Sequence, residues 1–151
     1  MTGSDRSVVT LRIAGDLLDP AEVTSLLKFS PTSAQKKGDV HIGDKNGQRY
    51  VRNIGMWRLR AEDSSSMNLN VQFMNILDRL PSDPTIWDDL ASRFKIDFFC
   101  GIFMGKWNEG IVLSPKVVAE LGERGIQLSL DIYGPDEDDT SIEPTINNPY
   151  I

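Results

Sequence analysis

The longest apolar run of the chain is Phe98 to Met104, seven residues that include Gly101. A helix that crosses a membrane needs roughly 20 apolar residues, so this run is too short to span a bilayer. Apart from Asp97, residues 96–104 are apolar at successive positions, a pattern typical of a strand buried on both faces near the centre of a sheet. We therefore expect the rest of the chain to assemble around a sheet that contains this strand.

Alternation of apolar and other residues predicts further strands. Residues 7–14 place Val9, Leu11 and Ile13 on one face. In the last predicted strand, residues 126–133, the apolar residues Leu128, Leu130 and Ile132 are expected to face the core. The remaining predicted strands are 40–42 and 49–51, which flank the hairpin-turn pair Asn46-Gly47, and also 56–60 and 111–113.

Proline after a capping residue marks three helix starts, at Asp19-Pro20, Asp83-Pro84 and Ser114-Pro115. The first of these helices is expected to end near Lys28, and the last to cover residues 116–121. Another helix is predicted where apolar residues recur at helical spacing before Pro81, at Phe73, Ile76, Leu77 and Leu80.

These elements follow one another without sustained strand–helix–strand repetition, which favours an α+β fold over a doubly wound one. We expect one antiparallel or mixed sheet with helices packed mainly on one face. A length of 151 residues fits a single domain. We assign it to residues 1–134, followed by an acidic C-terminal tail at residues 135–151.

Charge is distributed unevenly along the chain. Residues 36–60 contain seven Lys and Arg and two Asp, a net charge of +5, whereas the whole chain carries -6. Arg58 and Arg60 lie on the strand face opposite Trp57, and a folded hairpin would bring Arg49 and Arg52 near them. The predicted binding residues are Lys36, Lys37, Arg49, Arg52, Trp57, Arg58 and Arg60. The alternative interpretation is an ordinary solvated sheet face.

The residues that most often carry catalysis and metal binding are scarce. The chain has one cysteine, Cys100, among apolar neighbours, and one histidine, His41, in a polar segment. Neither a nucleophile–histidine triad nor a Cys/His metal cluster can be assembled from this pair alone. We therefore predict no catalytic residue, no metal and no cofactor. An enzyme with an unrecognised carboxylate or arginine site stays open as an alternative.

Several features favour a cytoplasmic protein. A lone cysteine forms no disulfide within the chain, which fits a reducing compartment. The polar start, Met1 to Arg6, leads into an alternating pattern instead of the apolar core of a secretory signal. We expect neither membrane residence nor export.

Several short motifs follow one another along the chain: the segment from Leu11 to Leu27, Ser30-Pro31-Thr32, Lys37-Gly38-Asp39, residues 55–59, Leu113-Ser114-Pro115 and residues 130–133. In this order they resemble a bacterial family known as domain of unknown function 4279. The resemblance spans roughly residues 7–134 and implies a compact intracellular α+β domain. That family is sometimes considered with immunity and other interaction proteins, and it implies no catalytic residue.

These observations predict a non-catalytic interaction protein, of an immunity-like or regulatory kind, that binds a protein partner through its charged surface. Assembly of the chain into a homo-oligomer is a further alternative. A net charge of -6 and a pI near 4.7 disfavour affinity for phosphate backbones. A small-ligand or nucleic-acid binding module that uses residues 36–60 is the alternative to a protein-binding role.

Overall fold

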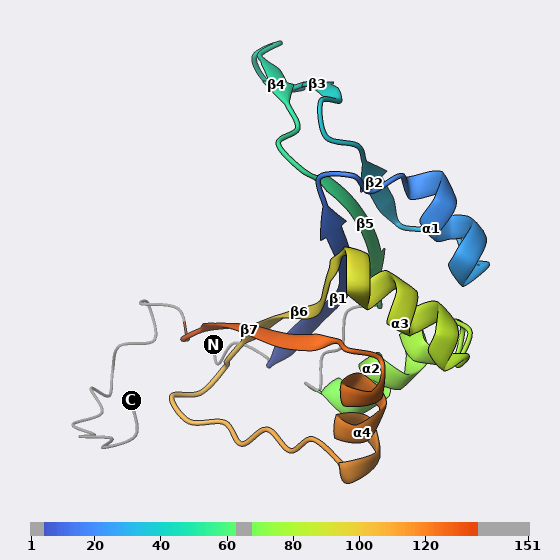
Figure 1. Cartoon of the computed structure of the whole chain (residues 1–151). Coiled ribbons are helices and arrows are strands. Elements are labelled where there is room, and N and C mark those ends of the chain that lie inside the picture. The colour runs from blue at the N-terminus through green and yellow to red at the C-terminus, as the bar shows by residue number, and fades with distance from the viewer. Residues whose placement is uncertain (1–4, 63–67, 136–151) are drawn as a thin grey trace.

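The computed structural model describes residues 5–62 and 68–135, and within them five strands form one mixed sheet (Figure 1). The strand order is β2-β5-β1-β6-β7, and only β6 and β7 are parallel. Two further strands, β3 and β4, pair with each other in a separate hairpin. The strands are β1 (Arg6–Gly15), β2 (Ser33–Gln35), β3 (Val40–Ile42), β4 (Arg49–Val51), β5 (Gly55–Arg60), β6 (Lys95–Phe103) and β7 (Gln127–Tyr133).

Helices cover one face of the sheet, as predicted. They are α1 (Pro20–Leu27), α2 (Leu69–Leu77), α3 (Pro84–Arg93) and α4 (Pro115–Glu123) in the described part of the chain. Asp19, Asp83 and Ser114 cap the three helices that begin with proline. The helices pack on four strands of the sheet, α1 against β5, α2 against β1, α3 against β6 and α4 against β7. The α+β fold class with a mixed sheet is thus confirmed.

Strand β1 runs through the middle of the sheet and separates its two faces. Ile13 lies beside Trp57 of β5 and Ile96 of β6, and all three side chains are buried under the helices. On the opposite face, Arg12 lies between Arg58 of β5 and Asp97 of β6. Strand alternation therefore builds the core on one face and a row of charged residues on the other.

Strand β6 is an interior strand, as its apolar sequence predicts. Phe98, Cys100 and Ile102 are fully buried on the helix-covered face. Phe99 and Phe103 are only half-buried, on the open face. The side chains on the two faces of β6 therefore differ in burial, because helices pack on one face alone.

The apolar residues of β7 lie on the core side of the sheet, as predicted, but they are only partly buried. Leu130 is 45% exposed and Ile132 is 52% exposed, while Leu128 is half-buried. These residues do share the face of β6 that carries the core. However, β7 is the last strand of the sheet, so that only α4 packs on it to an appreciable extent and the described residues place no strand along its outer side.

The loop between β6 and α4 contains no strand at residues 111–113, contrary to the sequence prediction. The side chain of Asn70 on α2 donates to the carbonyl of Val112 (2.8 Å) and accepts from the N–H of Ser114 (2.9 Å). A side-chain amide thus satisfies backbone groups that a neighbouring strand would otherwise bind. Residues 136–151, nearly all of the predicted acidic tail, lie outside the described residues.

The β3–β4 hairpin, which we call the arm, projects away from the sheet (Figure 1). Gly47 in its turn has a φ of 64°, a left-handed conformation that glycine adopts without strain. At the base of the arm, Gly38 donates to the carbonyl of Arg52, and Arg52 donates to the carbonyl of Asp39. None of the described helices is long and apolar enough to cross a membrane.

Candidate functional site

A pocket of about 420 Å³ lies where the arm meets the sheet. The end strand β2 forms part of its lining, the base of the arm forms another part, and β5 contributes one arginine. The lining residues are Ser33, Ala34, Gln35, Asp39, Val40, His41, Arg52 and Arg58. This volume falls within the range of pockets that hold small molecules or side chains of a partner.

Arg52 and Arg58 bring positive charge into this pocket. Both are half-buried. Burial, followed by the positive charges of Arg52 and Arg12, lowers the pKa of Arg58 from its ordinary value. Within the described part of the chain, neither the Arg52 nor the Arg58 guanidinium forms a hydrogen bond or an ion pair. The pocket therefore contains two cationic groups without a directly bound carboxylate.

Arg12 lies beside Arg58 on the sheet but has a dedicated partner. Its Nε donates to Asp97 Oδ1 (2.8 Å) and its Nη2 to Asp97 Oδ2 (2.5 Å). Ser129 on β7 donates a further hydrogen bond to Asp97 Oδ2 (2.9 Å). The hydrogen bonds to Asp97 raise the pKa of Arg12. Arg12 thus adds to the positive potential at Arg58, while its own guanidinium already binds a carboxylate.

Lys36 and Lys37 do not line the pocket. Lys36 Nζ lies 3.6 Å from Asp19 Oδ1, and Lys37 Nζ lies 3.1 Å from Asp16 Oδ2. Both acids belong to the segment between β1 and α1. The two lysines therefore connect the base of the arm to the body of the molecule, and their charges are partly neutralised there.

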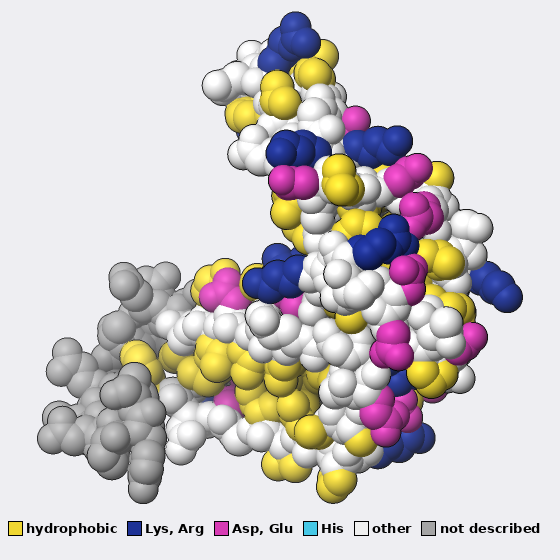
Figure 2. Space-filling model, in the orientation of Figure 1, with side chains coloured by type: hydrophobic (Ala, Val, Ile, Leu, Met, Phe, Trp, Pro, Cys, Tyr) yellow, Lys and Arg dark blue, Asp and Glu magenta, His cyan; other side chains and the backbone are white. Residues whose placement is uncertain are grey.

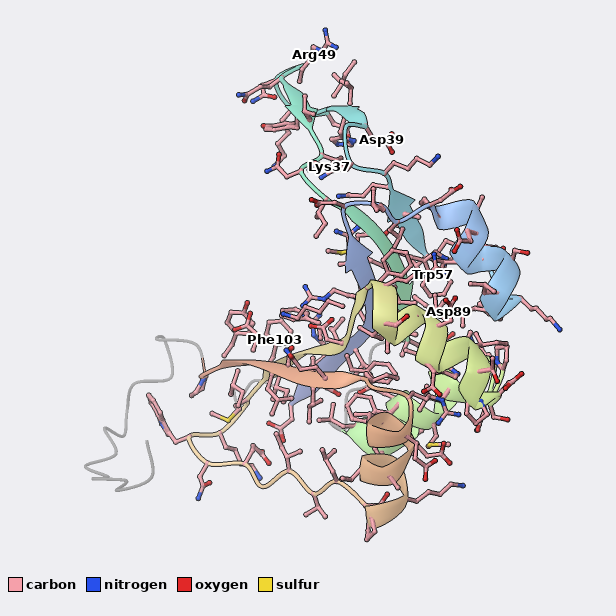
Figure 3. All side chains as sticks on the ribbon, in the orientation of Figure 1. Lys37, Asp39, Arg49, Trp57, Asp89 and Phe103 are labelled. Atoms are coloured by element: carbon pink, nitrogen blue, oxygen red, sulfur yellow. The ribbon has the colours of Figure 1, made fainter. Side chains whose placement is uncertain are left out.

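The other three predicted binding residues lie in three different places. Arg49 is near the far end of the arm, away from Trp57 (Figure 3). Arg60 is exposed on the same face of β5 as Arg58, beyond the pocket lining. Trp57 is fully buried, and its Nε1 donates to Thr24 Oγ1 on α1 (3.0 Å). Trp57 is therefore a core residue and contributes no exposed surface for binding.

Sequence reasoning missed several residues of the pocket. Ser33 and Gln35 belong to β2, a strand too short and polar to show a periodic signal. His41 enters the lining together with Asp39, whose Oδ2 accepts a hydrogen bond from the N–H of Lys36 (2.8 Å). The Lys37-Gly38-Asp39 turn was visible in the sequence, but its approach to Arg58 depends on pairing between distant segments.

The arrangement can bind an anion. An arginine guanidinium presents a planar set of donors that matches a carboxylate or a phosphate. The Ser33 hydroxyl is a further donor on the lining, whereas Gln35 already donates its Nε2 to the carbonyl of Ile54 (2.9 Å). The pocket thus provides charge and directional hydrogen bonding for a negatively charged group.

The one cysteine of the chain does not line this pocket. Cys100 is fully buried on β6, and burial, together with the charge of Asp97, raises the pKa of its thiol to about 12. The described residues also contain no group of three or more His, Cys, Asp or Glu side chains placed to hold a metal ion.

The arm adds exposed apolar surface next to the pocket. Its large apolar residues are exposed on both strands, at Val40, Ile42, Tyr50 and Val51. Figure 2 shows hydrophobic side chains on the arm with Lys and Arg side chains among them. Such a mixture of apolar and cationic groups is typical of a surface that contacts another molecule.

Comparison with protein-family models supplies an independent observation. The model of a family described as "Domain of unknown function (DUF4279)" matches residues 5–135. The comparisons with curated proteins and with solved structures found no match. The family description names neither a ligand nor a reaction.

Proposed function

The chain belongs to the DUF4279 family, and we propose that it is a non-catalytic interaction protein, of an immunity-like or regulatory kind, that binds an acidic segment of a protein partner. The partner's carboxylates occupy the pocket at Arg52 and Arg58, and its neighbouring residues contact the arm. Membership of the family also confirms the resemblance carried by the sequence motifs.

The observation that carries this proposal is the pair of arginines without a bound carboxylate. A half-buried guanidinium loses part of its hydration, and a second positive charge nearby adds repulsion. The lowered pKa of Arg58 reflects both effects. A bound carboxylate would relieve this repulsion, because its opposite charge favours the charged form of both arginines.

Two features favour a protein partner over nucleic acid. The chain carries a net charge of -6, which opposes the general attraction to phosphate backbones that nucleic-acid binding requires. The arm also exposes Ile42, Tyr50 and Val51, which suit the apolar and aromatic contacts of a protein interface.

A small anionic ligand is the second candidate, because the pocket volume of about 420 Å³ would accept one. The two candidates differ in what they need from the arm. A small ligand would use the pocket alone, whereas an acidic peptide would gain affinity from contacts along the arm and from several charges at once.

Titration calorimetry with an oligoglutamate peptide tests the proposal. We expect the double variant Arg52→Gln, Arg58→Gln to bind at least about 10-fold more weakly than the parent, because it lacks both charge-assisted pairs. The affinity of the parent should fall as salt is added, since these charges are partly exposed. A citrate titration gives the comparison with a small anion.

The matched control is the double variant Lys28→Gln, Lys116→Gln. It removes the same charge from two exposed residues outside the pocket lining. Equal loss of peptide binding in both double variants would mean that only net charge matters, and it would overturn the proposed site. Tight citrate binding that is lost in the Arg52 and Arg58 variant, with weak peptide binding, would favour the small-ligand candidate.

A further inference from the structure

Strand β7 presents backbone hydrogen-bonding groups along its outer edge. The carbonyl of Tyr133 accepts a hydrogen bond from the N–H of Met104 (3.0 Å), so Tyr133 directs its backbone groups toward the β6 side. In a strand, these groups point to opposite sides at successive residues. Leu128, Leu130 and Ile132 therefore direct their N–H and C=O groups outward, where the described residues provide no neighbouring strand.

This edge lacks three of the features that usually prevent pairing with another chain, although it carries one charged residue, Asp131. Exposed edge strands are commonly short or carry lysine or proline. The opposite edge strand, β2, has only 3 residues, whereas β7 has 7 residues and contains neither lysine nor proline. Its apolar side chains Leu130 and Ile132 are also about half exposed. Figure 2 shows hydrophobic side chains gathered along this part of the molecule.

We propose that two copies of this chain pair through β7 in an antiparallel arrangement, about a two-fold axis at Leu130. Leu130 is the midpoint of β7, so this register pairs the strand along its whole length. Leu130 lies opposite Leu130 of the partner subunit, and Leu128 lies opposite the partner's Ile132. These residues direct their backbone groups outward, so each opposed pair exchanges both backbone hydrogen bonds.

Side-chain chemistry supports the same register. The apolar residues of the two strands lie on one face, which extends the partly exposed apolar surface of each copy across the junction. Asp131 lies opposite the partner's Ser129, a polar side chain without charge. A shift that moves the axis to Asp131 would place the two Asp131 carboxylates directly opposite each other, and like charges in that position destabilise a strand pair.

This interface is separate from the proposed binding site. The pocket lies at β2 and β5, whereas β7 forms the other edge of the sheet. The dimer would therefore carry two pockets that both stay accessible. Its formation and the binding of an acidic peptide can fail independently of each other.

Sedimentation equilibrium of the full chain over a concentration series tests the dimer. We expect the parent to dimerise and Leu130→Lys to raise the dissociation constant by roughly 100-fold, because two lysines would face each other at the axis. The matched control is Val71→Lys, which places the same charge at a residue on α2 that is 60% exposed. We expect this control to dimerise as the parent does.

A parent that remains monomeric up to about 1 mM would overturn the proposal, as would equal dimerisation of the two lysine variants. Hydrogen exchange of the parent provides a test that needs no substitution. The amides of Leu128, Leu130 and Ile132 should exchange more slowly at high protein concentration than at low concentration. Exchange rates at these amides that do not change with concentration would also contradict pairing through β7.

Discussion

Arg12 and Asp97 form the most enclosed ion pair on the open face of the sheet among the described residues. The side chain of Asp97 is 6% exposed and that of Arg12 is 32% exposed. Breaking a buried pair leaves one charged group without its partner, which costs more than the pair itself contributes. The sequence shows Asp97 only as a polar exception in an apolar run, because its partner is distant in the chain.

We expect Asp97→Asn to lower the free energy of unfolding by about 2 to 3 kcal/mol, less than for a fully buried pair because Arg12 retains contact with water. Urea unfolding of Asp97→Asn, Arg12→Gln and the double variant measures this. The loss of unfolding free energy in the double variant should be clearly smaller than the sum of the losses in the two single variants. Additive costs would show that the two side chains do not interact significantly in solution.

The burial of Cys100 can be tested through the pH dependence of its thiol. Its pKa is raised from an ordinary value of 9.0 to about 12, mainly because burial disfavours the thiolate. The raised pKa means that folding favours the neutral thiol. This contribution to stability is complete below pH 9 and is lost as the pH rises toward 12.

At pH 8 we expect a thiol reagent to modify folded Cys100 at least about 1000-fold more slowly than a free thiol, because only the thiolate reacts. The same protein in guanidinium chloride should react rapidly with one equivalent, which serves as the control. Rapid and complete modification of the folded protein would place Cys100 at an accessible position and contradict its burial in β6.

At the level of elements, Phe98 is the largest side chain that β6 places in the core. This side chain is fully buried, and its ring centroid lies 4.8 Å from that of Phe73 on α2. Phe98→Ala should lower the free energy of unfolding by about 3 to 5 kcal/mol, because it removes a buried ring and leaves a cavity. Thermal and urea unfolding measure the loss.

Phe103→Ala provides the comparison within the same strand. Phe103 is half-buried on the open face, where it stacks on Tyr133 at 4.9 Å. We expect a smaller cost, about 1 to 2 kcal/mol, since less apolar surface returns to water. Equal costs for Phe98 and Phe103 would mean that both faces of β6 are covered to the same degree.

The elements that sequence predicted well are those with strong local signals. Proline after Asp19, Asp83 or Ser114 located three helix starts, and Asn46-Gly47 located the arm. The elements that it missed depend on distant partners. Strand β2 exists because it pairs with β5, and the exposure of Leu130 follows from the position of β7 at the edge of the sheet.

The same distinction applies to the candidate site. The excess of positive charge in residues 36–60 indicated the correct region, and the alternation of β5 placed Arg58 on the outer face. The sequence did not show that Lys36 and Lys37 pair with Asp19 and Asp16. Those pairs, like the approach of Arg12 to Arg58, arise from tertiary contacts between separate segments.

At the level of the whole molecule, the core and the proposed binding surface are spatially divided. The buried hydrophobic cluster includes residues of β1, β5, β6 and all four described helices, but none from the arm. The arm is attached through the backbone hydrogen bonds at its base, where Arg52 pairs with Gly38 and Asp39. Folding of the body should therefore not depend on the arm.

Replacing residues 40–51 by Asn-Gly tests this division. The two retained ends already approach each other, since the N–H of Arg52 lies 2.8 Å from the carbonyl oxygen of Asp39, and Asn-Gly suits a two-residue turn. We expect the free energy of unfolding to change by less than about 1 kcal/mol, because shortening a surface loop has a small entropic effect. Urea unfolding should remain a single transition.

The shortened protein also separates the contributions of the arm and the arginines to binding. It keeps Arg52 and Arg58 but lacks Val40 and His41 of the pocket lining, together with the exposed apolar residues of β3 and β4. We therefore expect weaker binding of an oligoglutamate peptide with the salt dependence preserved, since the cationic pair remains. Dimerisation through β7 should be unchanged, because that edge lies across the sheet from the arm. Loss of cooperative unfolding would show instead that the arm belongs to the folding unit, and a binding defect could then no longer be assigned to contacts with the partner.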